Sequence, residues 1–363
     1  MEKRVKWIAK KEIKQGRVDK YLEKSIEMNK MTNGGPCMEI LEKRLREILE
    51  INEDKDIILV NNGCSALHSL VSGINMVKNK TIKYITQNYT FPVSVQGCLR
   101  DSKIIDIDNG GGLDLNKINN EINNEIEGII VTNCFGNVVD ISKYIQWAKK
   151  QNKILLFDNA ACPYTFYDGI NSVNFGTGSI ISFHHTKPLG FGEGGAIIVD
   201  KIYSHAIKCI INFGYDTVSM TQQWHTYGSN YKMSDISAAY ILQYLDDFSH
   251  IVQVHHSLYN YFIAKLSTLV LSFPSSPILF PNFSSSTPFL SCFPLLFPFP
   301  VDLSSFSNFP FETRKYYKPL DIDLPGFSHH LWSHIICFPC HHDMLFSDID
   351  DIFDFISIIL SQS

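Results

Sequence analysis

The chain of 363 residues is long enough for one large domain and a smaller second one, each with its own buried core. Its 45% hydrophobic content is ordinary for a globular protein, and its formal net charge of −5 disfavours binding to nucleic acids or to anionic membrane surfaces. No apolar run is long enough to span a bilayer, so we expect neither a nucleic-acid nor a membrane partner.

Nine cysteines are scattered along the chain without regular spacing. An odd, unpatterned set is not typical of a disulfide framework, and residues 1–4 (Met-Glu-Lys-Arg) show no secretory signal pattern. We therefore expect reduced cysteines and a cytoplasmic protein. The run Cys337-Phe338-Pro339-Cys340-His341-His342 contains metal-ligating residue types but lacks a second spaced pair, so we expect no metal site.

A charged N-terminal arm precedes the first regular pattern. Residues 1–30 are mostly polar, with a helix expected over 20–28. The run Thr32-Asn33-Gly34-Gly35-Pro36 interrupts this pattern, because glycine and proline together favour a turn. Apolar residues then recur at helical spacing and predict an amphipathic helix over 39–49.

The next segment joins a strand, a small polar turn and a helix. Residues 57–60 are apolar and β-branched and predict a buried strand, and residues 66–74 predict a helix. Between them lies Asn61-Asn62-Gly63-Cys64-Ser65. Free backbone N–H groups, a hydroxyl and the helix dipole would converge there on an anion. The alternative is that Ser65 only caps the helix.

The alternation continues and predicts a layered α/β fold. Further strands and helices are expected in turn, the strands at residues 83–87, 104–108, 128–133 and 154–158 and the helices at 92–99, 116–126 and 141–150. Two more short apolar runs, 179–182 and 196–199, bring the expected strands to seven. Because only a loop joins these last two, we expect a mostly parallel sheet covered by helices, with one strand reversed.

A lysine and an aspartate stand out near the ends of these strands. Lys187 lies in the loop between the last two strands, where a partly apolar setting lowers the pKa of an amine enough to form an imine with an aldehyde. Asp158 ends the strand at 154–158. The pair suggests a pyridoxal phosphate site, because this cofactor needs a lysine for its aldehyde and an acid for its pyridine nitrogen. The alternatives are a helix-capping Asp158 and a solvated Lys187.

Several candidate residues share one expected edge of the sheet. In such sheets, ligands bind beyond the carboxyl ends of the strands. Five of these candidates lie at a strand end or in the loop that follows it: Ser65, Tyr89, Phe91, Asp158 and Lys187. Their convergence favours one functional site over the separate structural alternatives.

The pattern becomes mainly helical after residue 202, with helices expected over 234–245 and 246–266. Residues 272–310 then contain ten Ser, nine Phe and eight Pro but no Lys or Arg. A disordered tract is one interpretation. We favour irregular short strands, because nine phenylalanines need burial and proline confines strands to edges. A strand at 335–338 and a helix from residue 347 complete the pattern.

These elements divide the chain into two expected domains. The large domain covers residues 1–245, including the arm of residues 1–30, and carries the sheet and the lysine. The small C-terminal α+β domain covers residues 246–363.

Eight short motifs follow one another along about nine-tenths of the chain. They are Thr32-Asn33-Gly34-Gly35-Pro36, Asn62-Gly63-Cys64-Ser65-Ala66-Leu67, Tyr89-Thr90-Phe91, Phe135-Gly136-Asn137, Asp158-Asn159-Ala160-Ala161, Ser182-Phe183-His184 with Lys187, Gly192-Glu193-Gly194-Gly195 and Asn230-Tyr231-Lys232-Met233-Ser234-Asp235. In this order and spacing they resemble the DegT/StrS-type nucleotide-sugar aminotransferases. The resemblance implies a pyridoxal 5′-phosphate enzyme of fold type I, with an aspartate aminotransferase-like fold.

The resemblance also implies roles for individual residues. Lys187 would carry the cofactor as an imine and move a proton, Asp158 would pair with the pyridinium nitrogen, and Phe91 would stack on the ring. The phosphate would be held by a set of small residues and by the neighbouring subunit: Gly63, Cys64, Ser65, Ser182 and, from the partner chain, Asn230. The family therefore implies a homodimer with shared active sites.

Two segments are most similar to the viosamine-type branch of the family, namely residues 32–36 and Thr313-Arg314-Lys315-Tyr316-Tyr317. That branch aminates a nucleotide-linked 4-keto-6-deoxy sugar and usually takes the amine from glutamate. Substrate contacts are expected from Thr32, Asn33, Tyr89, His184, Glu193, Arg314 and Tyr316. Amination at C3 and a non-catalytic relative that keeps the fold remain alternatives. Lys187 disfavours the branch in which histidine replaces the lysine and a sugar hydroxyl is removed.

Overall fold

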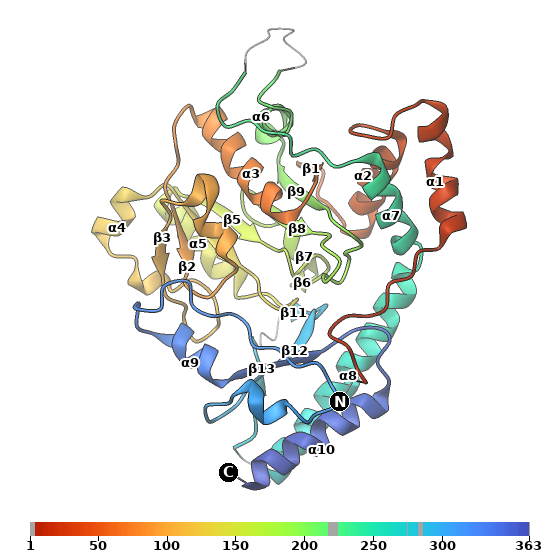
Figure 1. Cartoon of the computed structure of the whole chain (residues 1–363). Coiled ribbons are helices and arrows are strands. Elements are labelled where there is room, and N and C mark those ends of the chain that lie inside the picture. The colour runs from red at the N-terminus through yellow and green to blue at the C-terminus, as the bar shows by residue number, and fades with distance from the viewer. Residues whose placement is uncertain (1–3, 217–223, 274, 282–285, 363) are drawn as a thin grey trace.

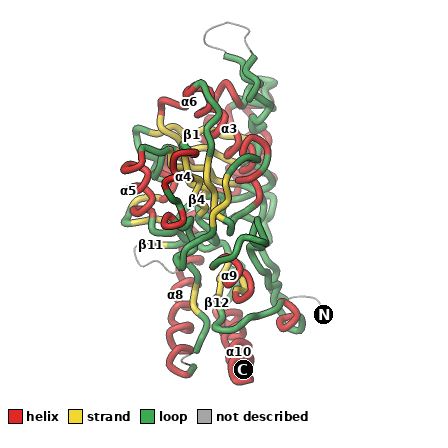
Figure 2. The backbone as a smooth tube through the Cα atoms, turned by 90° about the vertical axis from the view of Figure 1, so that its left-hand side faces the viewer, coloured by secondary structure: helices red, strands yellow, loops and turns green. Residues whose placement is uncertain are grey.

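The computed structural model, which describes residues 4–216, 224–273, 275–281 and 286–362, has a central sheet between layers of helices. Figure 1 shows this layered part above a smaller part, and the side view in Figure 2 shows the same division. The smaller part contains α8 (Phe248–Ser272), α9 (Phe327–His334) and α10 (Phe346–Gln362). Among the described residues, none of the helices has the length and apolar character needed to cross a membrane.

The central sheet has seven strands in the order β1-β9-β8-β5-β4-β2-β3. Strand β9 pairs antiparallel with both β1 and β8, and the other neighbours pair parallel. The expected mostly parallel sheet with one reversed strand is therefore confirmed. In chain order the strands are β1 (Lys55–Val60), β2 (Tyr84–Gln87), β3 (Lys103–Ile105), β4 (Gly128–Thr132), β5 (Ile154–Asp158), β8 (Gly178–Ser182) and β9 (Gly195–Asp200).

Both faces of the sheet are apolar. Successive side chains of a strand point to opposite sides, and in β1 both sets are apolar. In β1, Ile57 and Leu59 belong to a cluster with α2 and α7. Ile58 and Val60 belong to the cluster on the other face, with α3 and α6. The strand register shows that α5 covers the same face as α2 and α7. The covering helices are α2 (Pro36–Ile48), α3 (Gly63–Lys78), α5 (Ile141–Gln151), α6 (Lys201–Ile210) and α7 (Asp235–Leu245).

The expectation of a single helix over residues 92–99 is wrong. This segment forms two short 3₁₀ helices, η1 (Pro92–Val95) and η2 (Gly97–Leu99). Gly97 has a φ of +57°, a left-handed conformation that an α-helix cannot include.

The helix expected over residues 116–126 is also divided, into η3 (Leu115–Lys117) and α4 (Asn120–Glu125). The side chain of Asn119 accepts a hydrogen bond from the N–H of Ile122 at 2.9 Å and so begins a new helix. The strand expected at 104–108 ends earlier, at Ile105.

The phenylalanine-rich tract is ordered in its described part. Strand β12 (Cys292–Leu296) pairs with β10 (Ile278–Leu279) and β13 (Ile335–Pro339). Phe293 of β12 stacks on Phe262 of α8 with ring centroids 3.9 Å apart. Buried phenylalanines from the tract are Phe280, Phe289, Phe293, Phe297, Phe306 and Phe309. The expected short strands are therefore confirmed here, but the expectation that proline confines them to edges is wrong, because β12 contains Pro294 and is the middle strand of its sheet. Residues 274 and 282–285 lie outside the described part.

A second small sheet was not expected from the sequence. It has the order β11-β6-β7, and its strands are β6 (Phe166–Tyr167), β7 (Ile170–Asn171) and β11 (Ser286–Thr287). Each strand has only two residues, too few to show the alternation that identifies a strand. This sheet joins the phenylalanine-rich tract to the segment after β5.

Helix α8 contributes to two separate cores. Its first turns place Phe248 and Ile251 in the cluster under α2 and α7, and its later turns place Phe262 and Leu269 in the C-terminal cluster. The domain boundary expected at residue 245 falls at the end of α7, just before α8 begins. The division into domains of 1–245 and 246–363 stays a prediction.

The N-terminal segment (residues 4–14) returns to the C-terminal part of the chain. After it, α1 (Gln15–Glu27) packs on α7. Val5 forms a parallel β-bridge with Phe311, and the side chain of Arg4 pairs with Asp348 and Asp351 of α10. The arm is thus anchored on residues far from it in sequence.

Candidate functional site

A cavity of about 710 Å³ opens at the carboxyl ends of β4, β5 and β8. Thr132, Asp158 and Ser182 line it from these three strand ends. Other walls come from the first turn of α3, from the lysine loop (residues 183–194) between β8 and β9, and from C-terminal residues. Its volume is typical of a pocket that encloses a small molecule.

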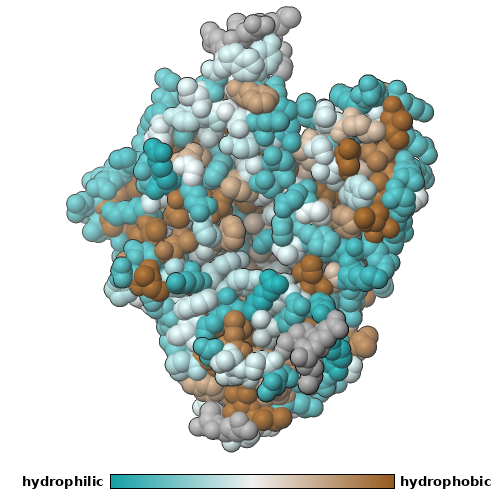
Figure 3. All heavy atoms as spheres, viewed as in Figure 1, coloured by the Kyte–Doolittle hydropathy of each residue, from teal (hydrophilic) through white to brown (hydrophobic). Residues whose placement is uncertain are grey.

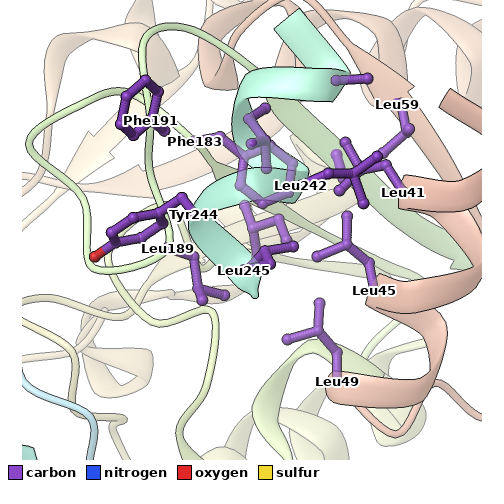
Figure 4. Close-up of a cluster of buried hydrophobic side chains, with 14 of the residues drawn as sticks. Leu41, Leu45, Leu49, Leu59, Phe183, Leu189, Phe191, Leu242, Tyr244 and Leu245 are labelled. Atoms are coloured by element: carbon purple, nitrogen blue, oxygen red, sulfur yellow. The ribbon is translucent and has the colours of Figure 1, made fainter. Parts of the chain in front are cut away.

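The lysine loop is anchored by its own backbone and by apolar packing. The N–H of Lys187 donates to the carbonyl of His184 at 2.7 Å, and the N–H of Gly190 donates to the carbonyl of Lys187 at 2.9 Å. Three side chains of the loop are buried against α2 and α7, as Figure 4 shows: Phe183, Leu189 and Phe191. Lys187 lines the cavity, where burial lowers the pKa of its amine and the Asp158 carboxylate partly opposes this effect.

Asp158 is buried at the end of β5 and faces the cavity. Its Oδ1 accepts the N–H of Ala160 at 3.0 Å, and a turn follows instead of a helix. The helix-capping alternative is therefore wrong. Burial raises the pKa of this carboxyl, while the N–H of Ala160 and the positive charge of Lys187 oppose that shift.

The first turn of α3 forms another wall of the cavity. Asn62 is the helix cap, because its side chain accepts the N–H of Ser65 at 2.8 Å; Ser65 is not the cap. Gly63 and Cys64 line the cavity, and their N–H groups lie in the turn whose donors have no partner inside a helix. A Cβ atom on Gly63 would lie 2.9 Å from the Cβ of Ser182, so only glycine lets the two segments approach this closely. The result is a set of donors suited to an anion.

The opposite wall comes from residues distant in sequence. Aromatic and cationic side chains face the cavity there: Trp7, Phe91, Phe135, Lys315, Tyr316, Tyr317, Lys318 and Trp332. At the entrance to the lysine loop, His184 Nε2 lies 3.5 Å from Glu193 Oε1, and both residues line the cavity.

The cavity gathers nine of the expected site residues, namely Gly63, Cys64, Phe91, Asp158, Ser182, His184, Lys187, Glu193 and Tyr316. The described structure leaves the other six outside its lining: Thr32, Asn33, Ser65, Tyr89, Asn230 and Arg314.

Tyr89 and Arg314 do not line the cavity, but both form hydrogen bonds with Tyr316, which does. Tyr89 is fully buried, and its hydroxyl donates to the carbonyl of Tyr316. The guanidinium of Arg314 donates to the hydroxyl of Tyr316 at 2.8 Å and lies 5.0 Å from the ring centroid of Trp7. Thr32, Asn33 and Asn230 are exposed elsewhere on the surface.

Sequence reasoning missed Trp7, Thr132 and Trp332 as cavity residues. Thr132 is the second-last residue of the strand expected at 128–133, and its place near the end of that strand could have identified it. Trp7 is a lone aromatic in a charged segment, and nothing in its local pattern shows which distant residues it meets.

Comparisons with known proteins show which sequences and folds this chain resembles. The sequence profile of the DegT/DnrJ/EryC1/StrS aminotransferase family matches residues 12–282. A dTDP-4-amino-4,6-dideoxy-D-glucose transaminase of Shigella dysenteriae is 29% identical over 353 residues, which cover 91% of each chain. A GDP-perosamine synthase of Escherichia coli O157:H7 is 24% identical over 260 residues, or 70% of each chain.

Solved structures show the same fold. Helicobacter pylori PseC, an aminotransferase involved in the biosynthesis of pseudoaminic acid, superposes with a TM-score of 0.82 over all of both chains at 19% identity. This likeness confirms the expected aminotransferase fold.

Proposed function

Because the chain belongs to the DegT/DnrJ/EryC1/StrS aminotransferase family, we propose that it transfers an amino group from glutamate to a nucleotide-linked 4-keto-6-deoxyhexose. The observation that carries this proposal is the meeting of Lys187, Asp158 and the first turn of α3 in one cavity. Glutamate would leave as its 2-oxo acid, and the sugar ketone would become an amine.

The residues around the cavity fit pyridoxal 5′-phosphate, the cofactor of this family. The N–H groups at Gly63 and Cys64, with the Ser182 hydroxyl, suit its phosphate, and Asp158 suits its pyridine nitrogen. When bound, the cofactor supplies an electron sink for charge that develops on the substrate. In our proposal the amine of Lys187 holds the cofactor covalently and moves the proton at the reacting carbon, while Phe91 covers the ring.

The proposed substrate rests on relatives and on the cavity wall. The Shigella relative is named for a dTDP-linked 4-amino-4,6-dideoxyglucose, which supports the viosamine-type assignment. Lys318, Trp7 and Trp332 line the cavity, whereas Lys315, which also lines it, donates from its Nζ to the carbonyls of Val301 and Ser333. Cationic and aromatic side chains together suit a diphosphate and a base.

The proposal is tested by supplying ¹⁵N-labelled glutamate and a panel of keto-sugar nucleotides. We expect ¹⁵N in the sugar at C4, detected by mass spectrometry and located by NMR. Label at C3 would favour the alternative site of amination. If cofactor and donor are both present and no sugar of the panel is labelled, the non-catalytic alternative is favoured.

Capture of the cofactor should depend on pH in a characteristic way. Only a neutral amine attacks an aldehyde, and burial lowers the pKa of Lys187 from its usual 10.5. The neutral fraction is therefore larger at a given pH than for an exposed lysine. We expect the rate of pyridoxal phosphate capture by the apoprotein to rise with pH and to level off below 10.5. Rapid-mixing absorbance at a series of pH values measures it, and a rate still rising at 10.5 would contradict the assignment.

We also propose that the protein is a cytoplasmic homodimer with shared active sites. Thr32, Asn33 and Asn230 are exposed outside the cavity of their own chain, as expected of residues that serve a partner subunit. Apolar side chains gather over the region of α1 and α2 in Figure 3, where Ile26 and Met28 are more than half exposed; such exposure favours an interface. All nine cysteines are free, which is compatible with a reducing compartment.

Shared sites predict that two inactive variants complement each other. In a mixed dimer of Lys187→Ala and Asn230→Asp chains, one site receives both lesions and the other neither. The aspartate places a negative charge against the phosphate and so opposes cofactor binding. We expect mixed dimers to recover up to about half of the parental activity, given two-fold symmetry.

The matched control puts both substitutions in one chain and mixes it with the parent. Each site of that mixed dimer then carries one lesion, so we expect no activity from it. If the control recovers activity and the first mixture does not, Asn230 acts within its own chain and the shared-site proposal fails.

A further inference from the structure

The N-terminal segment (residues 4–14) connects the C-terminal part of the chain to the lysine loop. At its start, the side chain of Arg4 pairs with Asp348 and Asp351. In the middle, the N–H of Trp7 donates to Glu312 Oε2 at 2.9 Å. The N–H of Lys10 then donates to a carboxylate oxygen of Asp343 at 2.7 Å. The segment is therefore fixed by residues 312–351 immediately before it reaches the loop.

Lys11 ends this path with three hydrogen bonds to the loop that carries Lys187. Its Nζ donates to the carbonyl oxygens of His185 at 2.7 Å, Lys187 at 2.8 Å and Gly190 at 2.5 Å. The ammonium also lies 4.8 Å from the ring centroid of Tyr244, whose hydroxyl donates to the carbonyl of Pro188 at 3.2 Å. Two side chains from other elements thus bind four carbonyl groups of one short loop.

The charge state of Lys11 follows from its partners. An ammonium has three N–H donors, one for each of the three carbonyl oxygens, whereas a neutral amine has only two. Burial lowers the pKa of Lys11 to about 7, because it disfavours the charged form, while the three carbonyl oxygens and the Tyr244 ring favour the ammonium. Lys11 is thus a half-buried side chain whose amine binds three carbonyl oxygens of the loop.

We propose that Lys11 is a positioning residue that clamps the lysine loop by binding three of its backbone carbonyls. The backbone at Lys187 is then preorganised before any ligand enters the cavity. Phe183, Leu189 and Phe191 hold the loop by packing of their side chains, and inside the loop the N–H of Gly190 donates to the carbonyl of Lys187. The clamp fixes that carbonyl directly. Because Lys11 belongs to a segment bound to residues 312–351, the clamp also ties the loop to the C-terminal wall of the cavity.

The first test uses the cofactor-free protein and does not depend on the proposed function. Lys11→Met keeps much of the side-chain length and removes the three donors. Hydrogen–deuterium exchange of peptides within 183–195 is measured for the parent, Lys11→Met and Lys10→Met. Lys10 is the matched control, because its side chain is 82% exposed and pairs only with Glu12 among the described residues. We expect exchange of the loop amides to be about tenfold faster or more in Lys11→Met and unchanged in Lys10→Met.

The second readout concerns the loaded protein and rests on the proposed function. A displaced Lys187 should change the pH midpoint of the visible absorbance of the bound cofactor and lower kcat more than it raises KM. The control variant should keep the parental midpoint. If the parent itself takes up no cofactor, the proposed function fails. The exchange result still shows whether Lys11 holds the loop, because it is measured without cofactor.

The clamp is overturned if Lys11→Met folds with parental circular dichroism and its loop exchanges like the loop of the parent. If Lys11→Met does not fold, the milder Lys11→Gln variant, which keeps two donors, is measured in the same way. Loop exchange in that variant equal to the parent would also overturn the clamp, and intermediate exchange would support it.

Discussion

Replacement of Lys187 by alanine is expected to abolish amine transfer and leave the fold intact. In the proposed reaction this amine both holds the cofactor and moves the proton, so no neighbouring group replaces it. We expect turnover to fall by at least about 10³-fold and the visible absorbance of the bound cofactor to disappear. The fold should survive, because the anchoring bonds of residue 187 come from its backbone N–H and carbonyl. Circular dichroism and the ¹⁵N-transfer assay measure the two effects.

The parent protein provides the control for this variant. Its visible band should vanish on dialysis against hydroxylamine, which removes a cofactor bound through its aldehyde. Residual turnover of Lys187→Ala within tenfold of the parent would contradict the catalytic role assigned to Lys187.

Asp158→Asn is expected to have the second-largest effect. A neutral amide no longer holds a proton on the pyridine nitrogen, and the cofactor becomes a poor electron sink. Loss of one such electrostatic partner in a buried site costs roughly 10²–10³-fold in rate, and we expect at least that here. The asparagine Oδ1 still accepts the N–H of Ala160, so the turn after β5 should persist.

The matched control is Asp140→Asn. Asp140 ends a loop, caps α5 by accepting the N–H of Lys143 and does not line the cavity. We expect it to change stability slightly and turnover little. If both variants keep parental turnover with normal cofactor content, Asp158 has only a structural role.

The centre of the site could be predicted from sequence because each part has a local signal. Asp158 ends an apolar run, Lys187 lies in a glycine-dense loop between two such runs, and Gly63 begins a helix after a strand. Parallel strands bring such ends to one edge of a sheet, and the cavity lies there. Local pattern and global topology therefore specify the same residues.

The outer wall and the support beneath the loop could not be predicted in this way. Trp7 meets residues near 312, and Lys11 meets residues near 187, so no local period records these contacts. The helix expected over 92–99 failed for a different reason. Gly97 fits a helical apolar pattern in sequence, but the chain uses its freedom to adopt a positive φ.

The attachment of residues 4–14 to residues 312–351 has a consequence for synthesis of the protein. The ribosome makes chain at about 5–20 residues per second, so the roughly 300 residues between Lys11 and Glu312 take about 15–60 s. The sheet and the lysine loop are complete well before the end of that interval, but residues 4–10 still lack their partners among residues 312–351. Trp7 is then open to solvent and to chaperones. The anchoring of the N-terminal segment is therefore tied to the last stage of translation, and a nascent chain stalled before residue 312 should show a folded sheet whose lysine loop exchanges faster than in the full chain.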